Sequence, residues 1–290
     1  MNMFDRLVDE ALKNAKELSP LRVVVEKELL HHDILRTLSK EGLLSGLTFM
    51  GGTCLRLCYG SNRLSEDLDF TGGKEFNKEL LSNMSQVLID SLKAKYELFI
   101  EISEPKHESG NVDTWVIKVQ TRPERKEMPT QRINIEICAI PSYQPKPMLL
   151  LNPYGVDLGT GGLILQAESR EEILADKIIA FALRKNRIKY RDLWDIVWLY
   201  QSNVKLSFDL VQKKIEDHKQ SNKVFINLLN KRKDALMKPG ASGKKEFIAE
   251  TQRFLAANVV KNTIQQDNYW LFLVNLTSDF SEQITEKISP

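Results

Sequence analysis

Apolar residues recur with helical spacing in the first part of the chain. From Leu21 through Glu41 they return every three or four positions, and Leu30, Ile34 and Leu38 would line the buried stripe. Ser19-Pro20, directly before this stretch, is a typical helix start with a capping serine and a proline at the first helical position. The pattern predicts a long amphipathic helix after a short first helical segment.

Two short apolar runs next to glycine pairs follow. Leu47 to Met50 ends in Gly51-Gly52, which predicts a buried strand, a tight turn and then a helix over residues 53–59. Asp67 to Phe70 is predicted to be a second strand, in which carboxylates alternate with apolar side chains, and Gly72-Gly73 ends it.

The next part of the chain mixes both periods. Asn77 to Lys95 has the pattern of a helix. Three later segments are strand candidates because they are rich in β-branched or aromatic residues: Leu98 to Ile102, Trp115 to Gln120 and Arg132 to Ile140. The order of elements predicts an α/β or α+β core.

The C-terminal part is expected to be helical. Prolines and glycines cluster from Pro141 to Gly162, and Ser169 with Glu172 then forms a capping box at the start of a helix. Lys238 to Lys245 is expected to be a loop between two late helices. We therefore predict a mixed core over residues 1–165 and a helical lobe over residues 166–290.

Composition narrows the class of protein. Of the 290 residues, 42% are hydrophobic and 28% charged, which is typical of an ordinary globular protein and excludes a disordered or fibrous one. The net charge of +2 hides a basic stretch, because no carboxylate lies between Lys177 and Arg191. Its second half, Arg184 to Arg191, is either a contact surface for a phosphate backbone or a solvated helix end.

Cysteine usage and hydropathy indicate the compartment. Cys54 and Cys58 lie in a helical pattern and Cys138 in a strand pattern, and the four histidines lack the spacing of a zinc finger. Reduced, buried thiols are expected, and with them a cytoplasmic protein. The N-terminus lacks the basic-then-apolar order of a signal peptide, and no apolar run approaches the ~18 residues of a membrane span.

The segment from Phe49 to Phe70 combines two chemical devices. Glycines between a strand and a helix let backbone amides approach a phosphate, and the Thr53 hydroxyl could add a donor. Asp67 and Asp69, two apart in a predicted strand, would project from one face, as suits Mg²⁺. Each device alone also fits a structural turn or a solvated strand face. The pair in this order is hard to explain by structure alone.

These motifs resemble a known family. The run Gly51-Gly52-Thr53-x-Leu55, followed by Arg63-x-Ser65-Glu66-Asp67-Leu68-Asp69-Phe70, is similar to the AbiEii-type nucleotidyltransferase toxins of abortive-infection toxin–antitoxin systems. The likeness is specific over residues 26–70 and looser to Glu136 and over residues 176–200. It implies a nucleotidyltransferase-type mixed-sheet core followed by a helical lobe.

The resemblance also implies roles for residues of the core. Gly52 and Thr53, with Gly51 in the same cradle, would contact the triphosphate, and Asp67 and Asp69 would bind Mg²⁺. Glu136 is the candidate third carboxylate and general base, on a polar face with Arg132 and Asn134 while Ile133, Ile135 and Ile137 face the core. A cross-strand salt bridge is the alternative for Glu136.

Roles in the helical lobe follow from the same resemblance. Lys177 would neutralise charge on the β- or γ-phosphate, while Asp192 would join the catalytic set and Asp195 the nucleotide contacts. The alternative is a pair of helices held together by salt bridges between these residues. Arg63 and Ser65 would either brace the Asp-x-Asp loop or contact substrate. Trp194 and Trp198 are expected in the core rather than as platforms for base stacking.

The expected reaction is transfer of a nucleoside monophosphate from a nucleoside triphosphate to an acceptor, with release of pyrophosphate. By resemblance the acceptor is tRNA or another RNA, the context is phage defence, and the partner is a cognate antitoxin. Three alternatives stay open: a small-molecule or protein acceptor, kinase-like phosphoryl transfer, and a catalytically silent nucleotide-binding protein. The basic stretch favours a polyanionic acceptor.

Overall fold

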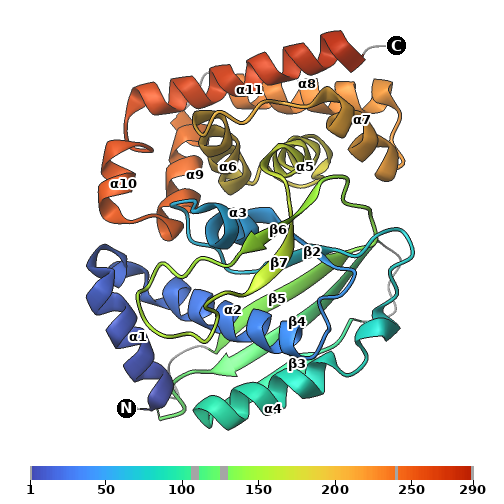
Figure 1. The fold of residues 1–290 in the computed structure, drawn as a ribbon. Coiled ribbons are helices and arrows are strands. Elements are labelled where there is room, and N and C mark those ends of the chain that lie inside the picture. Colours follow the sequence, from blue (N-terminus) through green and yellow to red (C-terminus); the bar gives the residue numbers. More distant parts are fainter. Residues whose placement is uncertain (1, 106–110, 125–129, 239–240, 289–290) are drawn as a thin grey trace. The chain divides into compact units, whose positions relative to one another are not determined.

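The computed structural model describes residues 2–105, 111–124, 130–238 and 241–288 (Figure 1). The chain divides into two compact units, Met1–Glu168 and Ser169–Pro290. None of the described helices combines the length and the apolar character that a membrane span requires.

The first unit carries a seven-stranded mixed sheet. Its strands are β1 (Thr48–Met50), β2 (Leu68–Thr71), β3 (Phe99–Ser103), β4 (Val112–Gln120), β5 (Gln131–Cys138), β6 (Pro145–Leu149) and β7 (Ile164–Glu168). Their order is β3-β4-β5-β2-β1-β7-β6. β2 pairs with β5, and β1 with β7, in parallel, and the other neighbours are antiparallel.

Helices pack on this sheet. They are α1 (Met3–Asn14), α2 (Arg22–Lys40), α3 (Gly51–Tyr59) and α4 (Met84–Tyr96), with short 3-10 helices η1 (Lys16–Leu21) and η2 (Lys78–Leu81). α2 packs against β5 and against α4, which in turn covers β3 (Figure 1). Ile133, Ile135 and Ile137 of β5 are fully buried, as their alternation predicts. The sheet with its helices confirms the expected mixed α/β core.

β6 and β7 were not expected, because they lie in or next to the segment rich in proline and glycine. Pro145 and Pro147 both belong to β6 and pair with Glu168 and Gln166 of β7. A proline has no N–H to give to a sheet, so it is tolerated mainly on an edge strand. β6 is one of the two edge strands of this sheet. The sequence rule against proline therefore failed where only one side of the strand needs partners.

The helix start expected at Ser19-Pro20 is wrong. Pro20 lies inside η1, and α2 begins at Arg22 with no side-chain cap. Arg22 instead forms ion pairs that tie this corner together, with Asp5 at 3.1 Å, Asp9 at 2.5 Å and Glu26 at 3.2 Å. Two of these three ion pairs connect the first residue of α2 to α1.

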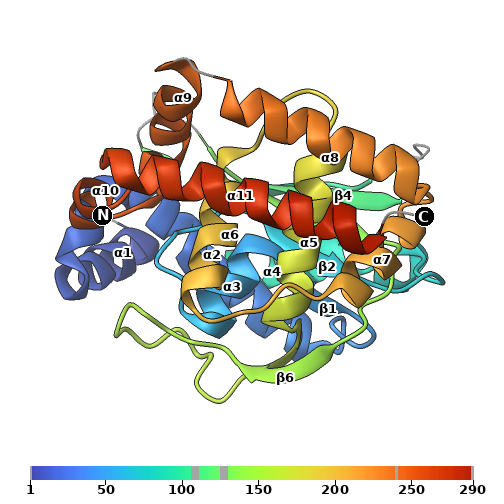
Figure 2. The same ribbon diagram turned by 90° about the horizontal axis from the view of Figure 1, so that it is seen from above.

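The second unit is a bundle of helices around α5 (Arg170–Leu183). The others are α6 (Tyr190–Gln201), α7 (Phe208–Asp217), α8 (Asn222–Met237), α9 (Ala241–Thr251), α10 (Ala257–Asn262) and α11 (Asp267–Ile288), with the 3-10 helix η3 (Gln252–Phe254). α5 contacts α6, α7 and α8, and α11 packs along α8 (Figure 2). The Ser169 side chain accepts from the Glu172 amide, as the capping box predicts.

The loop expected over residues 238–245 is wrong for its second half, because α9 already begins at Ala241. Pro239 and Gly240, from the first half of that segment, lie outside the described part of the chain. Gly243 belongs to α9. A Cβ atom there would lie 3.3 Å from the Trp270 indole, so the glycine fits a close approach of two helices rather than a turn.

Candidate active site

The three candidate carboxylates gather where β2 pairs with β5. Asp69 stands opposite Glu136 in the parallel register, and both side chains are half-buried. Asp67 precedes β2 rather than lying in it, so its expected place inside a strand is wrong. Its carboxylate is nevertheless fixed to β5, because Oδ1 accepts the Asn134 amide at 3.1 Å. The polar face expected on β5 is confirmed, and it brings Glu136 beside the Asp-x-Asp pair.

The turn between β1 and α3 needs both of its glycines. Gly51 has φ +76°, a left-handed conformation that side chains disfavour, and a Cβ atom there would collide with the Asp69 carboxylate. A Cβ atom at Gly52 would collide with the Arg63 guanidinium and would lie 3.2 Å from Ser65 Oγ. The glycine pair therefore lets the start of α3 lie directly against the Asp-x-Asp loop.

Thr53 holds that loop in place. It is fully buried, and its hydroxyl donates to the backbone carbonyl of Asp67. Sequence reasoning assigned this hydroxyl to a phosphate. In the structure it connects the two motifs instead, while the amide end of α3 remains the part of the cradle that suits an anion.

Helix α2 braces the same loop, which sequence reasoning missed. Glu28 is fully buried, and its carboxylate accepts the Ser65 amide at 3.0 Å, the Arg56 Nε at 3.1 Å and the Tyr154 hydroxyl. Lys27 forms an ion pair with Glu66 at 2.7 Å. The available signal was the number of charged residues next to the apolar stripe of this amphipathic helix, since a buried charge needs partners.

His31 adds a further contact from α2. Its Nε2–H donates to the backbone carbonyl of Glu66 at 3.0 Å, next to Asp67. Burial lowers the pKa of His31 to about 3, and burial also lowers the pKa of His32 to about 4. Both rings are therefore neutral at pH 7, so His31 is a fixed hydrogen-bond donor to the loop.

Arg63 and Ser65 belong to this brace. Both are buried, Arg63 Nη1 donates to the Leu64 carbonyl at 2.9 Å, and the Ser65 amide is held by Glu28. Of the two roles left open by the sequence, the structure supports the structural one.

The donor set at this place fits Mg²⁺ that arrives with a nucleotide. In the described part of the chain, no group of three or more His, Cys, Asp or Glu side chains is arranged to hold a metal ion by itself. Mg²⁺ does not need such a cage, because it keeps waters and binds through one or two carboxylates plus substrate phosphates. Asp67 and Asp69, both half-buried beside the glycine turn, offer that partial set.

The candidate residues of the helical unit form a second cluster. Lys177 Nζ lies 2.7 Å from Asp192 Oδ1 and 2.8 Å from Asp195 Oδ2, and Arg184 reaches Asp192 at 3.2 Å. Burial alone would raise the pKa of the Asp192 carboxyl, but the nearby charges of Lys177, Lys189 and Arg184 hold it well below its usual range. The salt bridges that sequence reasoning left open as an alternative are therefore present.

The two tryptophans of α6 differ in burial. Trp194 is buried and stacks on Tyr269 with ring centroids 5.6 Å apart. Trp198 is half-buried. The three cysteines are free thiols, Cys54 and Cys58 buried and Cys138 half-buried. The place of Trp194 agrees with the expected core role and the free thiols with the reduced-thiol interpretation, whereas Trp198 and Cys138 are less buried than expected.

A glycine turn that faces an Asp-x-Asp pair, with a third carboxylate on the neighbouring strand of a mixed sheet, defines a nucleotidyltransferase-type site. The family model "Nucleotidyl transferase AbiEii toxin, Type IV TA system" matches residues 33–277. The chain therefore belongs to the AbiEii family of nucleotidyltransferase toxins from type IV toxin–antitoxin systems. This confirms the resemblance and the enzyme class expected from the motifs.

Solved structures agree on the fold. The chain is similar to JHP933 from Helicobacter pylori, with 20% identity, a TM-score of 0.50, and coverage of 91% of this chain and 94% of that one. It is also similar to MenT4, a nucleotidyltransferase toxin from Mycobacterium tuberculosis, with 15% identity, a TM-score of 0.54, and coverage of 94% and 98%. At these identities the likeness shows a shared fold. No curated protein matches the chain.

Proposed function

We propose that this toxin transfers a nucleoside monophosphate from a nucleoside triphosphate to an RNA acceptor, tRNA first among them, with Mg²⁺ held by Asp67 and Asp69. The observation that carries the proposal is the pairing of β2 with β5, which sets Asp69 opposite Glu136 and fixes Asp67 to Asn134. A toxin of a type IV system has an antitoxin partner. The acceptor and the nucleotide would be met in the cytoplasm.

The glycine turn would bind the triphosphate. Backbone amides at the start of α3 carry the positive end of the helix dipole, which favours an anion, and Gly51 and Gly52 let this helix start lie directly against the Asp-x-Asp loop that would hold the metal. Thr53 would contribute through its backbone, since its hydroxyl is bound to Asp67. Mg²⁺ bound with the nucleotide would offset phosphate charge.

Glu136 is proposed as the general base. It would accept the proton of the acceptor hydroxyl while that oxygen bonds to the α-phosphorus and the bond to the pyrophosphate oxygen breaks. Its half-buried place opposite Asp69 sets it beside the metal ligands. Lys177, which Asp192 and Asp195 hold by ion pairs, is proposed to contact the β- and γ-phosphates, where its charge would favour the departing pyrophosphate.

The test is incubation of the purified protein with Mg²⁺, total bacterial tRNA and each α-³²P-labelled nucleoside triphosphate in turn. The variant is Asp69→Asn. The matched control is Asp113→Asn, which removes a half-buried carboxylate from β4 of the same sheet. We expect the unmutated protein and the control to label the RNA with at least one nucleotide, and Asp69→Asn to lose at least ~100-fold of that rate.

Other outcomes are decisive as well. Labelling of a protein or small molecule instead of RNA would overturn the acceptor while keeping the reaction class. Label that enters RNA only from γ-³²P nucleotides would show phosphoryl transfer instead. Equal rates for Asp69→Asn and the unmutated protein would remove the metal-binding role proposed for Asp69.

A further inference from the structure

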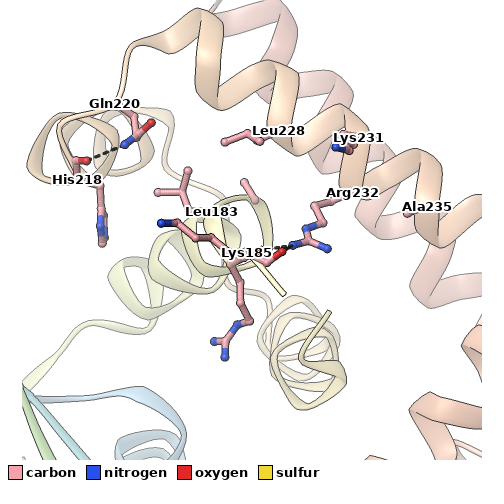
Figure 3. Close-up of a pocket in the computed structure, with 10 residues that line it drawn as sticks. Leu183, Lys185, His218, Gln220, Leu228, Lys231, Arg232 and Ala235 are labelled. Carbon is pink, nitrogen blue, oxygen red and sulfur yellow. Dashed lines mark hydrogen bonds between the residues drawn. The ribbon is translucent and has the colours of Figure 1, made fainter. Parts of the chain in front are cut away.

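The helical unit contains a pocket of about 490 Å³ that the proposed reaction does not use. It lies between the C-terminal end of α5, the residues that follow α7, and α8. Figure 3 shows Lys185, just past α5, between Arg232 of α8 on one side and His218 and Gln220 on the other. Its size is that of a ligand site rather than of a packing defect.

The polar lining of this pocket is basic. Arg184, Lys185, Lys231 and Arg232 contribute four cations, and no carboxylate belongs to the lining. Lys185 and Lys231 are exposed, and neither forms an ion pair with a described carboxylate. Arg184 is partly neutralised by Asp192 at 3.2 Å. An uncompensated group of cations around a pocket raises the local concentration of anions.

Arg232 gives the pocket a fixed shape. Its Nη2 donates to the backbone carbonyls of Arg184 and, at 3.1 Å, Lys185. These partners carry no net charge, so the guanidinium stays cationic while it holds the segment after α5 near α8. A guanidinium held in one orientation suits phosphate better than a freely moving ammonium does.

The remaining lining argues for recognition of a nucleic-acid backbone rather than of a base. It consists of aliphatic side chains, together with His218 and Gln220, and includes no Phe, Tyr or Trp ring, the larger platforms on which a base could stack. Gln220 Nε2 is itself bound to the His218 carbonyl at 3.1 Å. Arg187, exposed on the same loop as Lys185, forms no ion pair with a described carboxylate and extends the positive surface beyond the pocket. Cations spread over two elements fit a polymer of phosphates.

We propose that this pocket, with Lys185 and Lys231 at its rim, binds backbone phosphates of the RNA acceptor. The proposal rests on the proposed function, because it takes RNA to be the acceptor. Phosphate contacts of this kind fix the position of an RNA without reading its sequence. The pocket would then bind RNAs of many different sequences, and residues outside the pocket would select the hydroxyl that reacts.

The test is RNA binding by fluorescence anisotropy, in EDTA and without nucleotide, so that catalysis has no part in the readout. The variant is Lys185→Glu with Lys231→Glu, and the control is Lys205→Glu with Lys261→Glu, which makes the same charge change at exposed lysines outside the pocket. We expect binding at least ~10-fold weaker for the pocket variant, with a slope of log K against log salt shallower by about 2. The control should bind within about 2-fold of the unmutated protein.

Thermal unfolding of both double variants shows whether they are folded. Equal RNA affinity of folded pocket and control variants would overturn the pocket proposal, while label transfer to RNA by the unmutated protein would leave the proposed function intact. Calorimetric titration with ATP and with inorganic phosphate separates the sources of phosphate. If the pocket variant loses ATP binding but keeps RNA binding, the pocket is a nucleotide site and the proposal is wrong. If the unmutated protein neither binds nor labels RNA, both proposals fail together.

Discussion

Single residues at the turn between β1 and α3 determine how closely the two motifs approach. Gly51 combines a left-handed backbone with a position against the Asp69 carboxylate. Gly46 has the same kind of backbone, with φ +78°, and open space around it. Substitutions at the two positions can therefore distinguish the effect of backbone strain, which both share, from displacement of Asp69, which only Gly51 would cause.

We predict that Gly51→Ala and Gly46→Ala each lower the free energy of unfolding by about 1–2 kcal/mol, the cost of a left-handed backbone with a side chain. Only Gly51→Ala should abolish nucleotide transfer, because its methyl group would displace Asp69. Urea denaturation and the labelling assay measure the two effects. Full transfer activity in Gly51→Ala would show that the position of Asp69 is not critical.

Other residues show where sequence reasoning reached its limit. The alternation in β5 placed Glu136 correctly, because a strand of period two fixes the face of every residue. The sequence motif around Thr53 did not predict the partner of its hydroxyl, which donates to a backbone carbonyl 14 residues away. A hydroxyl can serve a phosphate or a backbone oxygen equally well, and only the fold decides between them.

At the scale of elements, α2 buries several polar residues that its pattern of apolar positions does not predict. Glu26, Glu28 and Asp33 are fully buried, as are His31 and His32. Each carboxylate finds partners on another element, for example Tyr96 and Lys95 of α4 for Asp33. Periodicity predicted the helix, but not these partners, since they come from segments far away in the sequence.

The two histidines of α2 predict a dependence of stability on pH. Their pKa values of about 3 and about 4 lie below the unfolded value near 6.5, so the unfolded chain binds more protons between these limits. Stability is therefore complete above pH 6.5 and falls as the pH drops. Each histidine should lower the free energy of unfolding by about 1.4 kcal/mol per pH unit, which is roughly 2 kcal/mol for each histidine between pH 6.5 and pH 5.

Urea denaturation at pH 6.5 and pH 5.0 measures this loss. The comparison is the double variant His31→Gln with His32→Asn, whose amides do not titrate and can replace the ring contacts to Glu66 and Thr160. We expect the double variant to lose less stability on acidification than the unmutated protein. An identical loss in both would assign the acid sensitivity to other groups.

The pairing of α5 with α6 raises the question of whether Lys177 acts in chemistry or only in structure. Lys214 is a matched control in the same helical unit, since it is fully buried between Glu172 at 2.8 Å and Asp176 at 3.1 Å. Replacing either lysine removes a cation that two carboxylates share, although Asp192 keeps its contact with Arg184. We predict that Lys177→Met and Lys214→Met each lower the free energy of unfolding by about 3–5 kcal/mol.

Activity should distinguish the two lysines. At a temperature where both variants are folded, Lys177→Met should lose about 100-fold in transfer rate, because a phosphate contact is gone, whereas Lys214→Met should stay within a few-fold of the unmutated protein. Circular dichroism fixes the temperature and the labelling assay gives the rates. Equal rates in the two variants would show that Lys177 only ties α5 to α6.

At the scale of the whole molecule, the class of protein could be predicted from the sequence because the motif that defines it lies within one short segment. The strand, glycine turn, helix and Asp-x-Asp pair all fall within residues 49–70, where spacing alone limits the geometry. The complete sheet was not readable, because β6 and β7 gain their stability from neighbours that the local composition does not show. The basic pocket likewise joins Lys185 to Lys231 across 46 positions of the chain.

The parallel pairing of β2 with β5 also has a consequence for synthesis of the toxin. Asp67 is bound to a strand residue that lies 67 positions later in the chain. A ribosome releases the N-terminal part first, so both aspartates emerge well before β5 can pair with them. The growing chain therefore lacks its third carboxylate and the anchor of Asp67. On the proposed function, the nascent toxin is inactive during that interval of translation.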